Sequence, residues 1–377
     1  MRTYIVKSGD SLYSIARKFG VSDKELAYLN QLAEPNKLTT GLALYIPGGS
    51  NTQSGQIEVN GYAYPNISKA TLAETLPYLT FLCPFSWHMD EAGGLTPIDD
   101  ASLIADAYAG GTAPMLTITN IGSNGGFSSD IAHAVFTDMQ VQDTLVQNIL
   151  SALRSRGYYG VNFNIEYVYP FDREGYNAFL RRMADTLHPL GYYLSTAIAP
   201  KESDEQQGLL YTAHDYAAHG QYCDRVIIMT YEWGYTYSSP QAVSPVNRMR
   251  RVLDYAVTKI PSGKILLGFS NYGYSWALPW QQGQAARVIS NAAAQNLANA
   301  TFSEIKYDTL AQAPHFNYTD PSGQRREVWF EDVRSVKARL QLVREYNLAG
   351  ISYWTITQLF RPGLLTLQSE FSVEKIV

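Results

Sequence analysis

Short apolar runs alternate with longer amphipathic segments along most of the chain. From residue 57 onward, eight of these runs have the length of buried strands, and segments with helical spacing separate most of them. Strands that alternate with helices indicate a parallel sheet, and eight parallel strands close into a TIM barrel, (β/α)8. The pattern therefore predicts an α/β fold with barrel strands at 57–64, 79–86, 114–121, 159–166, 192–199, 225–231, 264–270 and 349–355.

One interval between the predicted strands is too long for a single helix. Residues 271–329 separate the seventh strand from the eighth, and they contain a helical pattern at 283–298 and strand-like stretches at 302–307 and 327–330. The loops that follow barrel strands lie at the C-terminal face, where barrels carry their chemistry. We therefore expect a small α+β insertion between strands seven and eight, above that face.

The first 48 residues have a pattern of their own. A strand-like stretch at 4–6 is followed by a helix that Asp10 or Ser11 can cap, and by a second helix that opens with the capping box Ser22–Glu25. A closing strand follows at 42–46. This order predicts a small βααβ domain.

The residues after this domain contain no hydrophobic side chain that could be buried. Residues 49–56 are therefore predicted to be a flexible linker, which offers no apolar surface to dock the small domain rigidly. The expected division of the chain is a small domain at 1–48, a linker at 49–56 and a barrel at 57–377.

Composition and charge exclude several classes of function. The 377 residues include 29 basic and 34 acidic side chains, for a net charge of −5, and no run of five Lys or Arg occurs, which argues against a nucleic-acid partner. The only cysteines, Cys83 and Cys223, lie in apolar runs and are expected to be buried thiols. No apolar segment is long enough to span a membrane, and no signal peptide is visible.

The fourth predicted strand carries polar side chains where a barrel interior usually has apolar ones. Alternation places Val161, Phe163 and Ile165 on the face toward the helices. The opposite face, toward the barrel axis, carries Gly160, Asn162, Asn164 and Glu166. Such inward polar groups need partners or a chemical role. A buried hydrogen-bond network with Glu166 held by an arginine stays open as the alternative to an active site.

Other strand ends place further polar and aromatic residues at the same mouth. Met229 and Tyr231 point inward from strand six, Trp354 points inward from strand eight, and strand seven leads into the segment 271–276. The chain contains 28 Tyr and 6 Trp, whose flat apolar faces and polar edges suit sugar rings, although a large barrel also needs aromatic residues for its core. No His, Cys and Asp cluster has metal-ligand spacing and no Gly-rich phosphate loop occurs, so no metal or cofactor is expected. The mouth is typical of a carbohydrate cleft.

Three segments of the predicted barrel resemble motifs of the family 18 glycoside hydrolases. Gly160–Glu166 resembles the strand-four signature D-x-x-D-x-D-x-E, with Glu166 in the position of the proton donor. Met229–Glu232 resembles the strand-six motif, and Trp354 matches the tryptophan that closes the barrel. The resemblance implies a glycosidase with this fold.

Further segments resemble one branch of that family, the bacterial spore cortex-fragment-lytic N-acetylglucosaminidases. They are Tyr158–Pro170, Ala199–Lys201, Tyr231–Gly234 and Trp329–Asp332. In that branch LysM peptidoglycan-binding modules precede the barrel, and residues 4–47 look like one such module. The resemblance implies that the module contacts glycan through Gly9, Asp10, Ser11 and Leu12.

The chain departs from the family signature at its aspartates. Tyr159, Asn162 and Asn164 occupy the three aspartate positions, and only the glutamate is retained. In this family the acetamido oxygen of the substrate acts as the nucleophile, so a second carboxylate is not required. The resemblance implies that Glu166 is the general acid and base, that Asn164 holds the acetamide N–H and that Tyr231 donates to its carbonyl. The implied substrate-binding residues are Asn162, Met229, Glu232, Trp233, Asn271, Tyr272 and Trp354.

These inferences predict a retaining N-acetylglucosaminidase that cleaves β-1,4 bonds of peptidoglycan, with spore cortex fragments as its substrate. We expect a monomer that is associated with the spore or the cell wall. Two other functions stay open, which are a chitinase or chito-oligosaccharide hydrolase and a non-catalytic protein that binds cell-wall glycan.

Overall fold

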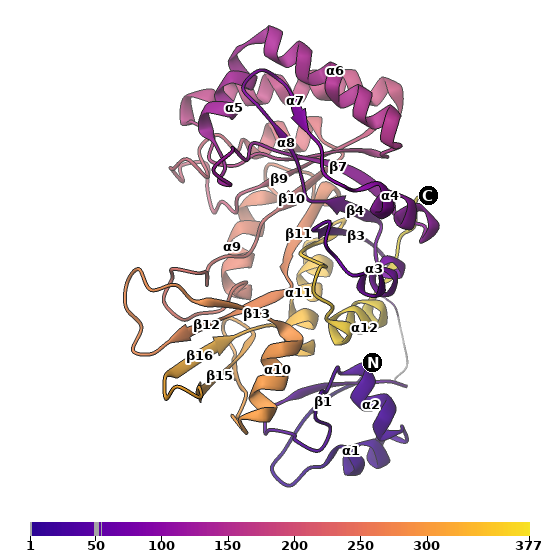
Figure 1. The fold of residues 1–377 in the computed structure, drawn as a ribbon, viewed down its shortest axis with the longest axis vertical. Helices are drawn as coiled ribbons and strands as arrows, with labels where there is room; N and C mark the ends of the chain where they lie inside the picture. Colours follow the sequence, from indigo (N-terminus) through magenta and orange to yellow (C-terminus); the bar gives the residue numbers. More distant parts are fainter. Residues whose placement is uncertain (1, 49–52, 54) are drawn as a thin grey trace.

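The computed structural model of the chain describes residues 2–48, 53 and 55–377. Its centre is a closed barrel in which each of eight parallel strands pairs with the next and the last pairs with the first (Figure 1). Each strand lies within or close to one of the predicted runs, which confirms the TIM barrel. The strands are β3 (Gln56–Ala63), β4 (Phe81–Pro84), β7 (Ala113–Thr119), β8 (Gly160–Asn164), β9 (Tyr193–Ile198), β10 (Arg225–Ile228), β11 (Ile265–Ser270) and β17 (Gly350–Trp354).

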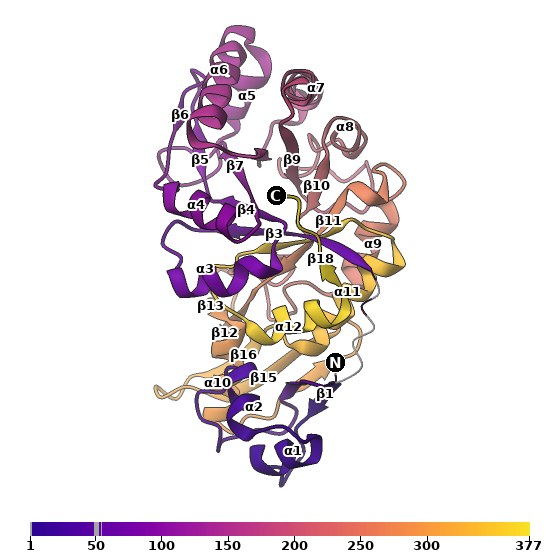
Figure 2. The same cartoon turned by 90° about the vertical axis from the view of Figure 1, so that its right-hand side faces the viewer.

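Helices surround the barrel and cover its outer face (Figure 2). They are α3 (Lys69–Thr75), α4 (Ala101–Ala109), α5 (Ser129–Thr137), α6 (Met139–Arg156), α7 (Arg173–Leu187), α8 (Tyr216–Tyr222), α9 (Val246–Ala256), α11 (Val333–Glu345) and α12 (Arg361–Glu370). The core between strands and helices contains Val161, Phe163 and Ile165, as alternation predicts. Within the described residues, no helix combines the length and hydrophobicity needed to cross a membrane.

Short strands complete the edges of the barrel. β5 (Trp87–Met89) and β6 (Leu95–Thr96) extend the sheet after β4, and β18 (Ser372–Val373) pairs with β3 near the C-terminus.

The segment between β11 and β17 is an α+β insertion, as predicted. Five antiparallel strands form a sheet in the order β13-β12-β16-β15-β14. Their bounds are β12 (Tyr272–Ala277), β13 (Arg287–Ser290), β14 (Lys306–Asp308), β15 (Ala313–Thr319) and β16 (Arg325–Trp329). The helix α10 (Asn291–Ala300) begins later than the predicted 283, because β13 occupies that stretch and the Ser290 side chain caps the helix.

The N-terminal domain has the predicted βααβ order. β1 (Arg2–Ile5) pairs antiparallel with β2 (Ala43–Ile46), and α1 (Leu12–Phe19) and α2 (Asp23–Leu29) lie between them. Ser11 caps α1 through a capping box with Ser14, and Ser22 caps α2. Most of the predicted linker, residues 49–52 and 54, lies outside the described residues.

The small domain shares a hydrophobic core with the insertion, which lies beside it in both ribbon views (Figures 1 and 2). Leu26 and Leu44 of the domain belong to the same buried cluster as Ala298, Phe316 and Phe330 of the insertion. The expectation that no apolar surface docks this domain rigidly is therefore wrong. The linker has no apolar side chain, but the apolar docking surface lies on the domain and on the insertion instead.

Hydrogen bonds reinforce this joint between the domain and the insertion. The backbone N–H groups of Ala33 and Thr39 donate to the side chains of Asn296 (2.9 Å) and Asn299 (3.0 Å) on α10. Gly41 has a φ of +86°, and a Cβ at this position would lie 1.9 Å from the carbonyl oxygen of Ile305. The approach of the two backbones therefore requires glycine at position 41.

A second contact joins the small domain to α12. The Arg361 guanidinium lies 3.9 Å from the ring centroid of Tyr28 and donates to the Tyr28 carbonyl oxygen (2.6 Å), and it forms an ion pair with Glu74. The Arg361 backbone N–H donates to the Gln31 side chain (2.7 Å). Apolar, polar and cation–π contacts together hold the N-terminal domain against the insertion and against α12 of the barrel.

Candidate active site

Glu166 follows the C-terminal end of β8, and the side chain of Asn120 fixes its backbone. Asn120 Oδ1 accepts from the Glu166 N–H (3.0 Å), and Asn120 Nδ2 donates to the Glu166 carbonyl oxygen (2.8 Å) and to that of Ser128 (2.9 Å). The hydrogen-bonded pairing of β7 with β8 ends at Thr119 and Asn164. Beyond that point the Asn120 side-chain amide supplies the hydrogen bonds that a neighbouring strand would otherwise make with the Glu166 backbone. The backbone that carries the Glu166 carboxyl group is therefore clamped on both sides.

The environment of Glu166 suits a general acid. Burial raises the pKa of Glu166 to about 7, the nearby charge of Glu232 adds to this, and a hydrogen bond from Asn164 opposes it. A carboxyl group with this pKa keeps much of its proton near neutral pH and can deliver it to a leaving oxygen. The other end of the Asn164 amide, Oδ1, is buried and has no hydrogen-bond partner among the described residues. It is free to accept an N–H from a ligand.

Aromatic rings form the floor of the cavity in front of Glu166. Trp354, at the end of β17, packs against Tyr62, Tyr64 and Phe85, with ring centroids 5.4, 6.0 and 4.7 Å away and the planes steeply inclined. The cavity has a volume of about 600 Å³. The residues that line it are Tyr64, Phe85, Ile121, Phe127, Asn164, Glu166, Tyr167, Ala199, Pro200, Leu210, Tyr211, Met229, Tyr231, Glu232, Tyr235 and Trp354. It has the size and the chemical character of a sugar-binding pocket.

A second carboxylate stands at the rim of the cavity. Glu232 follows β10, and it accepts hydrogen bonds from the hydroxyls of Tyr272 and Tyr274 on β12. Burial raises the pKa of Glu232, and the two hydroxyl bonds oppose the rise. The insertion therefore contributes directly to the site, because its strand β12 supplies both tyrosines.

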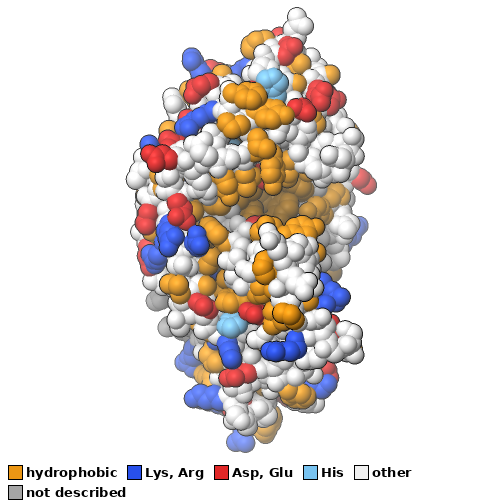
Figure 3. Space-filling view, turned by 90° about the vertical axis from the view of Figure 1, so that its left-hand side faces the viewer, with side chains coloured by type: hydrophobic (Ala, Val, Ile, Leu, Met, Phe, Trp, Pro, Cys, Tyr) orange, Lys and Arg blue, Asp and Glu red, His pale blue; other side chains and the backbone are white. Residues whose placement is uncertain are grey.

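Two smaller hollows adjoin the central cavity. One adjoining hollow of about 310 Å³ shares Pro200, Tyr211, Tyr231 and Glu232 with the cavity and also contacts Trp233. Another of about 370 Å³ shares Tyr64, Glu232 and Trp354 and also contacts Asn271 and Tyr272. The space-filling view shows the resulting hollow, with hydrophobic side chains inside it (Figure 3). A cleft made of three adjoining hollows has room for more than one sugar unit.

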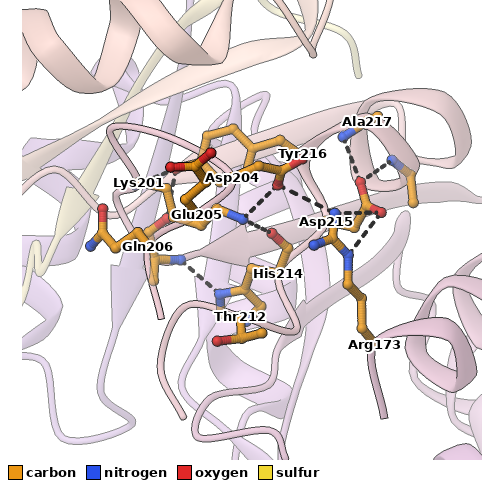
Figure 4. Close-up of polar contacts among 12 residues, drawn as sticks. Arg173, Lys201, Asp204, Glu205, Gln206, Thr212, His214, Asp215, Tyr216 and Ala217 are labelled. Carbon is orange, nitrogen blue, oxygen red and sulfur yellow. Dashed lines mark hydrogen bonds and ion pairs between the residues drawn. The ribbon is translucent and has the colours of Figure 1, made fainter. Parts of the chain in front are cut away.

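The loop after β9, which forms one wall of the cleft, rests on a polar network (Figure 4). His214 Nε2 donates to the carbonyl oxygen of Ile165 (3.0 Å), and its Nδ1 accepts from the Ala199 N–H (3.0 Å). Burial lowers the pKa of His214 to about 4, so the ring is neutral and can hold both bonds at once. His214 thus ties the residue before Glu166 to the base of the opposite wall.

Charged groups hold the rest of this loop. The buried Lys201 Nζ donates to Asp204 (3.1 Å) and to the His214 carbonyl oxygen (3.0 Å), and Arg173 on α7 forms an ion pair with Asp215 (3.0 Å), as Figure 4 shows. Asp215 also caps α8. Lys201 is buried, Arg173 and Asp215 are half-buried and Asp204 is exposed, and their contacts support the wall of the cleft.

The structure brings most of the predicted site residues together. Asn164, Met229, Tyr231, Glu232 and Trp354 line the central cavity with Glu166, and the adjoining hollows hold Trp233, Asn271 and Tyr272. Asn162 lies deeper, where it accepts from the Tyr62 hydroxyl (2.7 Å) and donates to Ser195 (2.9 Å), and it lines none of these hollows.

The side chain of Asn271 faces the protein rather than the open cleft. Asn271 Nδ2 donates to the carbonyl oxygens of Thr355 (2.9 Å) and Gln358 (2.7 Å). The backbone N–H of Asn271 donates to the carbonyl oxygen of Trp354 (3.0 Å). Asn271 therefore holds the segment that follows the floor tryptophan.

The four predicted glycan contacts of the small domain form the turn into α1. Asp10 accepts from the Tyr4 hydroxyl and the Lys7 N–H (both 2.8 Å), Ser11 caps the helix, and the Leu12 side chain is buried in the core. Gly9 has a φ of +85° with open space around it. The side chains of Asp10, Ser11 and Leu12 thus shape this turn, and Gly9 and Ser11 are exposed on its outer surface.

Sequence reasoning missed the residues that position Glu166 and part of the cleft wall. Asn120 lies inside the predicted strand 114–121, so its position at a strand end was a usable signal. His214 and Tyr211 lie in an irregular loop whose course the sequence pattern does not define. In the part of the chain that the structure describes, no group of three His, Cys, Asp or Glu side chains could hold a metal ion.

Comparisons with known proteins agree with this site. Residues 114–358 match the family described as glycosyl hydrolases family 18, and residues 4–47 match the LysM domain. Both resemblances seen in the sequence are confirmed.

Similar proteins match over the whole length of the chain. A cortical fragment-lytic enzyme of Bacillus subtilis (strain 168) is 42% identical, with 100% of this chain and 99% of the relative covered. A putative sporulation-specific glycosylase, YdhD, of the same organism is 35% identical over 99% of this chain and 88% of its own length. The crystal structure of the Bacillus megaterium QM B1551 spore cortex-lytic enzyme SleL superposes with a TM-score of 0.94 at 32% identity, covering 100% of this chain and 99% of that one.

Proposed function

We propose that this chain, which belongs to the family 18 glycosyl hydrolases, cleaves the glycan strands of spore cortex peptidoglycan after N-acetylglucosamine with retention of configuration. One observation carries the proposal. Glu166, a half-buried acid whose pKa is raised to about 7 by desolvation, lies beside an unpartnered amide oxygen, Asn164 Oδ1, and an aromatic floor. The names of the relatives support the choice of cortex as the substrate.

In the first step the substrate supplies its own nucleophile. The carbonyl oxygen of the 2-acetamido group attacks the anomeric carbon, the bond to the glycosidic oxygen breaks, and that oxygen takes the proton of Glu166. Asn164 Oδ1 accepts the acetamide N–H, and the Tyr231 hydroxyl donates to the acetamide carbonyl. These two contacts hold the group in line for attack and stabilise the oxazolinium-type intermediate.

In the second step water opens the intermediate. The Glu166 carboxylate, now ionised, takes a proton from a water molecule, and the oxygen of that water bonds to the anomeric carbon on the face that the leaving group has vacated. The acetamide returns to its starting state, and Glu166 is protonated again. Two inversions at one carbon give net retention.

The neutral Asn164 has a cost and a benefit for this chemistry. An amide oxygen stabilises the cationic intermediate through its dipole only, whereas a carboxylate would contribute a full charge. The benefit is that Glu166 has no like-charged neighbour on its own strand.

The nucleophile of the first step restricts the substrate. Only sugars with a 2-acetamido group can supply it, which excludes cellulose.

The small domain is proposed to bind the same glycan. We divide the chain into a LysM module at 1–48, a linker at 49–56 and a catalytic barrel at 57–377, acting as a monomer at the spore cortex or the cell wall. Because the module is seated on the insertion, it presents its glycan contact at a fixed distance from the cleft, which raises the effective concentration of substrate.

Mass spectrometry of digested cortex provides the test. Purified full-length protein is expected to release fragments that end in reducing N-acetylglucosamine, and NMR taken early in the reaction is expected to show the β-anomer first. Glu166→Gln serves as the inactive control. Release of reducing N-acetylglucosamine from chitin oligosaccharides but not from cortex would make the chain a chito-oligosaccharide hydrolase instead.

A further inference from the structure

The loop that follows Glu166 carries aromatic residues at alternate positions. Tyr167, Tyr169 and Phe171 point away from the core, while Val168 between the first two is buried. Tyr167 belongs to the cleft wall, where Phe127 packs against it at 6.3 Å between ring centroids. Tyr169 and Phe171 lie beyond that wall and have no part in the proposed reaction.

Tyr169, Phe171 and His133 form an ordered cluster, the aromatic platform. The rings of Tyr169 and Phe171 are stacked, with centroids 5.1 Å apart and planes inclined by 16°, and His133 meets Phe171 edge-on at 5.7 Å. Phe171 is 73% exposed, more than any other large hydrophobic side chain in the described part of the chain. A flat apolar face is thus held open to solvent beside the cleft.

Helix α5 fixes the platform from below. The Ser129 hydroxyl donates to the carbonyl oxygen of Tyr167, the Tyr169 hydroxyl donates to Asp130 (2.8 Å), and His133 Nδ1 bonds to Asp172 (2.9 Å). Tyr169 precedes Pro170, which favours the extended backbone observed there. Because the rings are already ordered, a ligand does not have to immobilise them, and binding is more favourable for that reason.

We propose that the aromatic platform is an accessory glycan subsite, which binds pyranose rings of a strand that extends out of the cleft past Tyr167. The inference rests on the proposed function, because it takes the occupant of the cleft to be a glycan. A pyranose ring presents a face of C–H groups that stacks on an aromatic ring, and the platform has two such rings, with the exposed Asp130 carboxylate at its edge.

The platform lies close to the cleft wall, and for this reason we take its ligand to be the glycan that the cleft binds. Four residues of extended chain span at most about 14 Å, so Phe171 lies within a few sugar units of Tyr167 in the cleft wall. The space-filling view shows a band of hydrophobic side chains that reaches into the hollow of the cleft (Figure 3). A strand that leaves the cleft on the side of Tyr167 therefore reaches the platform within a few sugar units.

Affinity as a function of glycan length tests the subsite. The full-length Glu166→Gln protein is titrated calorimetrically with the trimer and the hexamer of β-1,4-linked N-acetylglucosamine, with and without Phe171→Ala. We expect Phe171→Ala to lower the ratio of hexamer to trimer affinity by about tenfold, the effect of one aromatic contact. Phe171→Trp, which keeps a flat face, should restore the ratio.

Phe302→Ala is the matched control, because Phe302 is 68% exposed and lies on the insertion, away from the loop after β8. It should leave the ratio unchanged. An unchanged ratio in Phe171→Ala overturns the subsite. Equal losses for both oligomers also overturn it, because Phe171 would then support the cleft itself.

The same experiment separates this inference from the proposed substrate. If the native protein leaves cortex uncut but the affinity ratio still depends on Phe171, the substrate proposal fails and the subsite stands. No measurable affinity for the hexamer would overturn the subsite whatever the activity on cortex.

Discussion

The cleft and the joint that holds the LysM module on the insertion differ in how they use their polar groups. In the cleft, Asn164 Oδ1 is buried without a partner and the pKa of Glu166 lies far above its ordinary value. At the joint, both ends of the Asn296 amide bond to backbone groups of the module, to the Gln31 carbonyl oxygen (2.8 Å) and the Ala33 N–H (2.9 Å). Asn299 is the exception at the joint, because its Oδ1 accepts from the Thr39 N–H but its buried Nδ2 has no partner among the described residues. The cleft thus combines an unpartnered amide with an acid of raised pKa, whereas Asn296 at the joint uses both ends of its amide internally.

One element connects the two regions. The insertion supplies Tyr272 and Tyr274 to Glu232 through β12, and its helix α10 and strands β15 and β16 share the core of the module. A disturbance of the joint can therefore reach the rim of the cleft. A substitution that changes kcat but not the free energy of unfolding, or the reverse, shows how far the cleft and the joint are independent of each other.

Glu166→Gln should have the largest effect on rate. Loss of the proton donor is expected to lower kcat on soluble cortex fragments by about 10²–10⁴-fold or more, because the leaving group is a poor one. Binding should persist, since glutamine keeps the shape and one acceptor. Turnover is measured by mass spectrometry and affinity by calorimetry. Near-native turnover would place the acid elsewhere in the cleft.

Glu166→Gln, which lowers the rate, should raise the stability of the protein near neutral pH. The unfolded chain releases the Glu166 proton near pH 4.5, the ordinary value, and the folded chain holds it to a pKa of about 7. The folded state therefore binds more protons in this range, so the contribution of Glu166 to stability falls as pH rises from 4.5 to 7 and stays reduced above it. Glu166→Gln removes this loss. Its Tm relative to the native protein should rise between pH 5 and pH 8.

Asn120→Ala should combine a loss of rate with a loss of stability. It leaves the Glu166 N–H and carbonyl group without their partner, at about 1–3 kcal/mol of stability for such buried groups. Misplacement of the acid is expected to lower kcat about 10–100-fold with a smaller change in KM. Because the carboxyl group would be less confined, the alkaline limb of the pH profile should also move.

Asn124→Ala is the control for this substitution. Asn124 lies in the same loop, is exposed and bonds only to the Gly126 N–H (3.0 Å) among the contacts described. It should keep the native kcat and pH profile. If Asn120→Ala lowers Tm but not kcat, Asn120 is a structural residue with no part in positioning the acid.

The fold was largely predictable from the sequence, and the site only in part. The barrel strands follow from apolar runs that must be buried on both faces, and Glu166 follows from alternation along β8. The seat of the module could not be predicted in this way, since pairs such as Thr39 with Asn299 are 260 residues apart and join a side chain to a backbone group. Such contacts leave no periodic pattern in the sequence.

Gly41→Ala should break the joint and leave the acid untouched. A Cβ would lie 1.9 Å from the Ile305 carbonyl oxygen, so the module must shift. We expect a loss of about 1–3 kcal/mol of stability and about 2–4 °C in Tm for each kcal/mol. Activity on insoluble cortex should fall more than activity on soluble fragments. Calorimetry and parallel rate assays measure the two effects.

Gly20→Ala controls for the backbone strain alone. Gly20 has a similar φ of +69° and open space around it. Should Gly41→Ala lower Tm no further than Gly20→Ala, the module is not seated on the insertion in solution. Removal of residues 1–48 is a stronger disruption, because it uncovers Ala298, Phe316 and Phe330, and we expect it to lower Tm as well as activity on insoluble cortex.

Asn164→Asp should have the smallest effect on maximum rate and the clearest effect on its pH dependence. In the native protein kcat is expected to fall as pH rises through one ionisation, that of Glu166 near its pKa of about 7. The acidic limb should be shallow, because Asn164 has no proton to lose. An aspartate at 164 places a second carboxylate beside Glu166, so the two titrate as a coupled pair. An acidic limb should then appear, and the alkaline limb should move to higher pH.

The measurement is kcat against pH for both forms on a soluble fragment that ends in N-acetylglucosamine. Glu232 is the other carboxylate near Glu166, and its charge already adds to the pKa of the acid. Glu232→Gln should therefore move the alkaline limb slightly to lower pH and create no acidic limb. If the native profile is already a steep bell and Asn164→Asp leaves it unchanged, Glu232 is the functional second carboxylate. Asn164 would then not be the group that holds the acetamide, and its free amide oxygen would have to bind another part of the substrate.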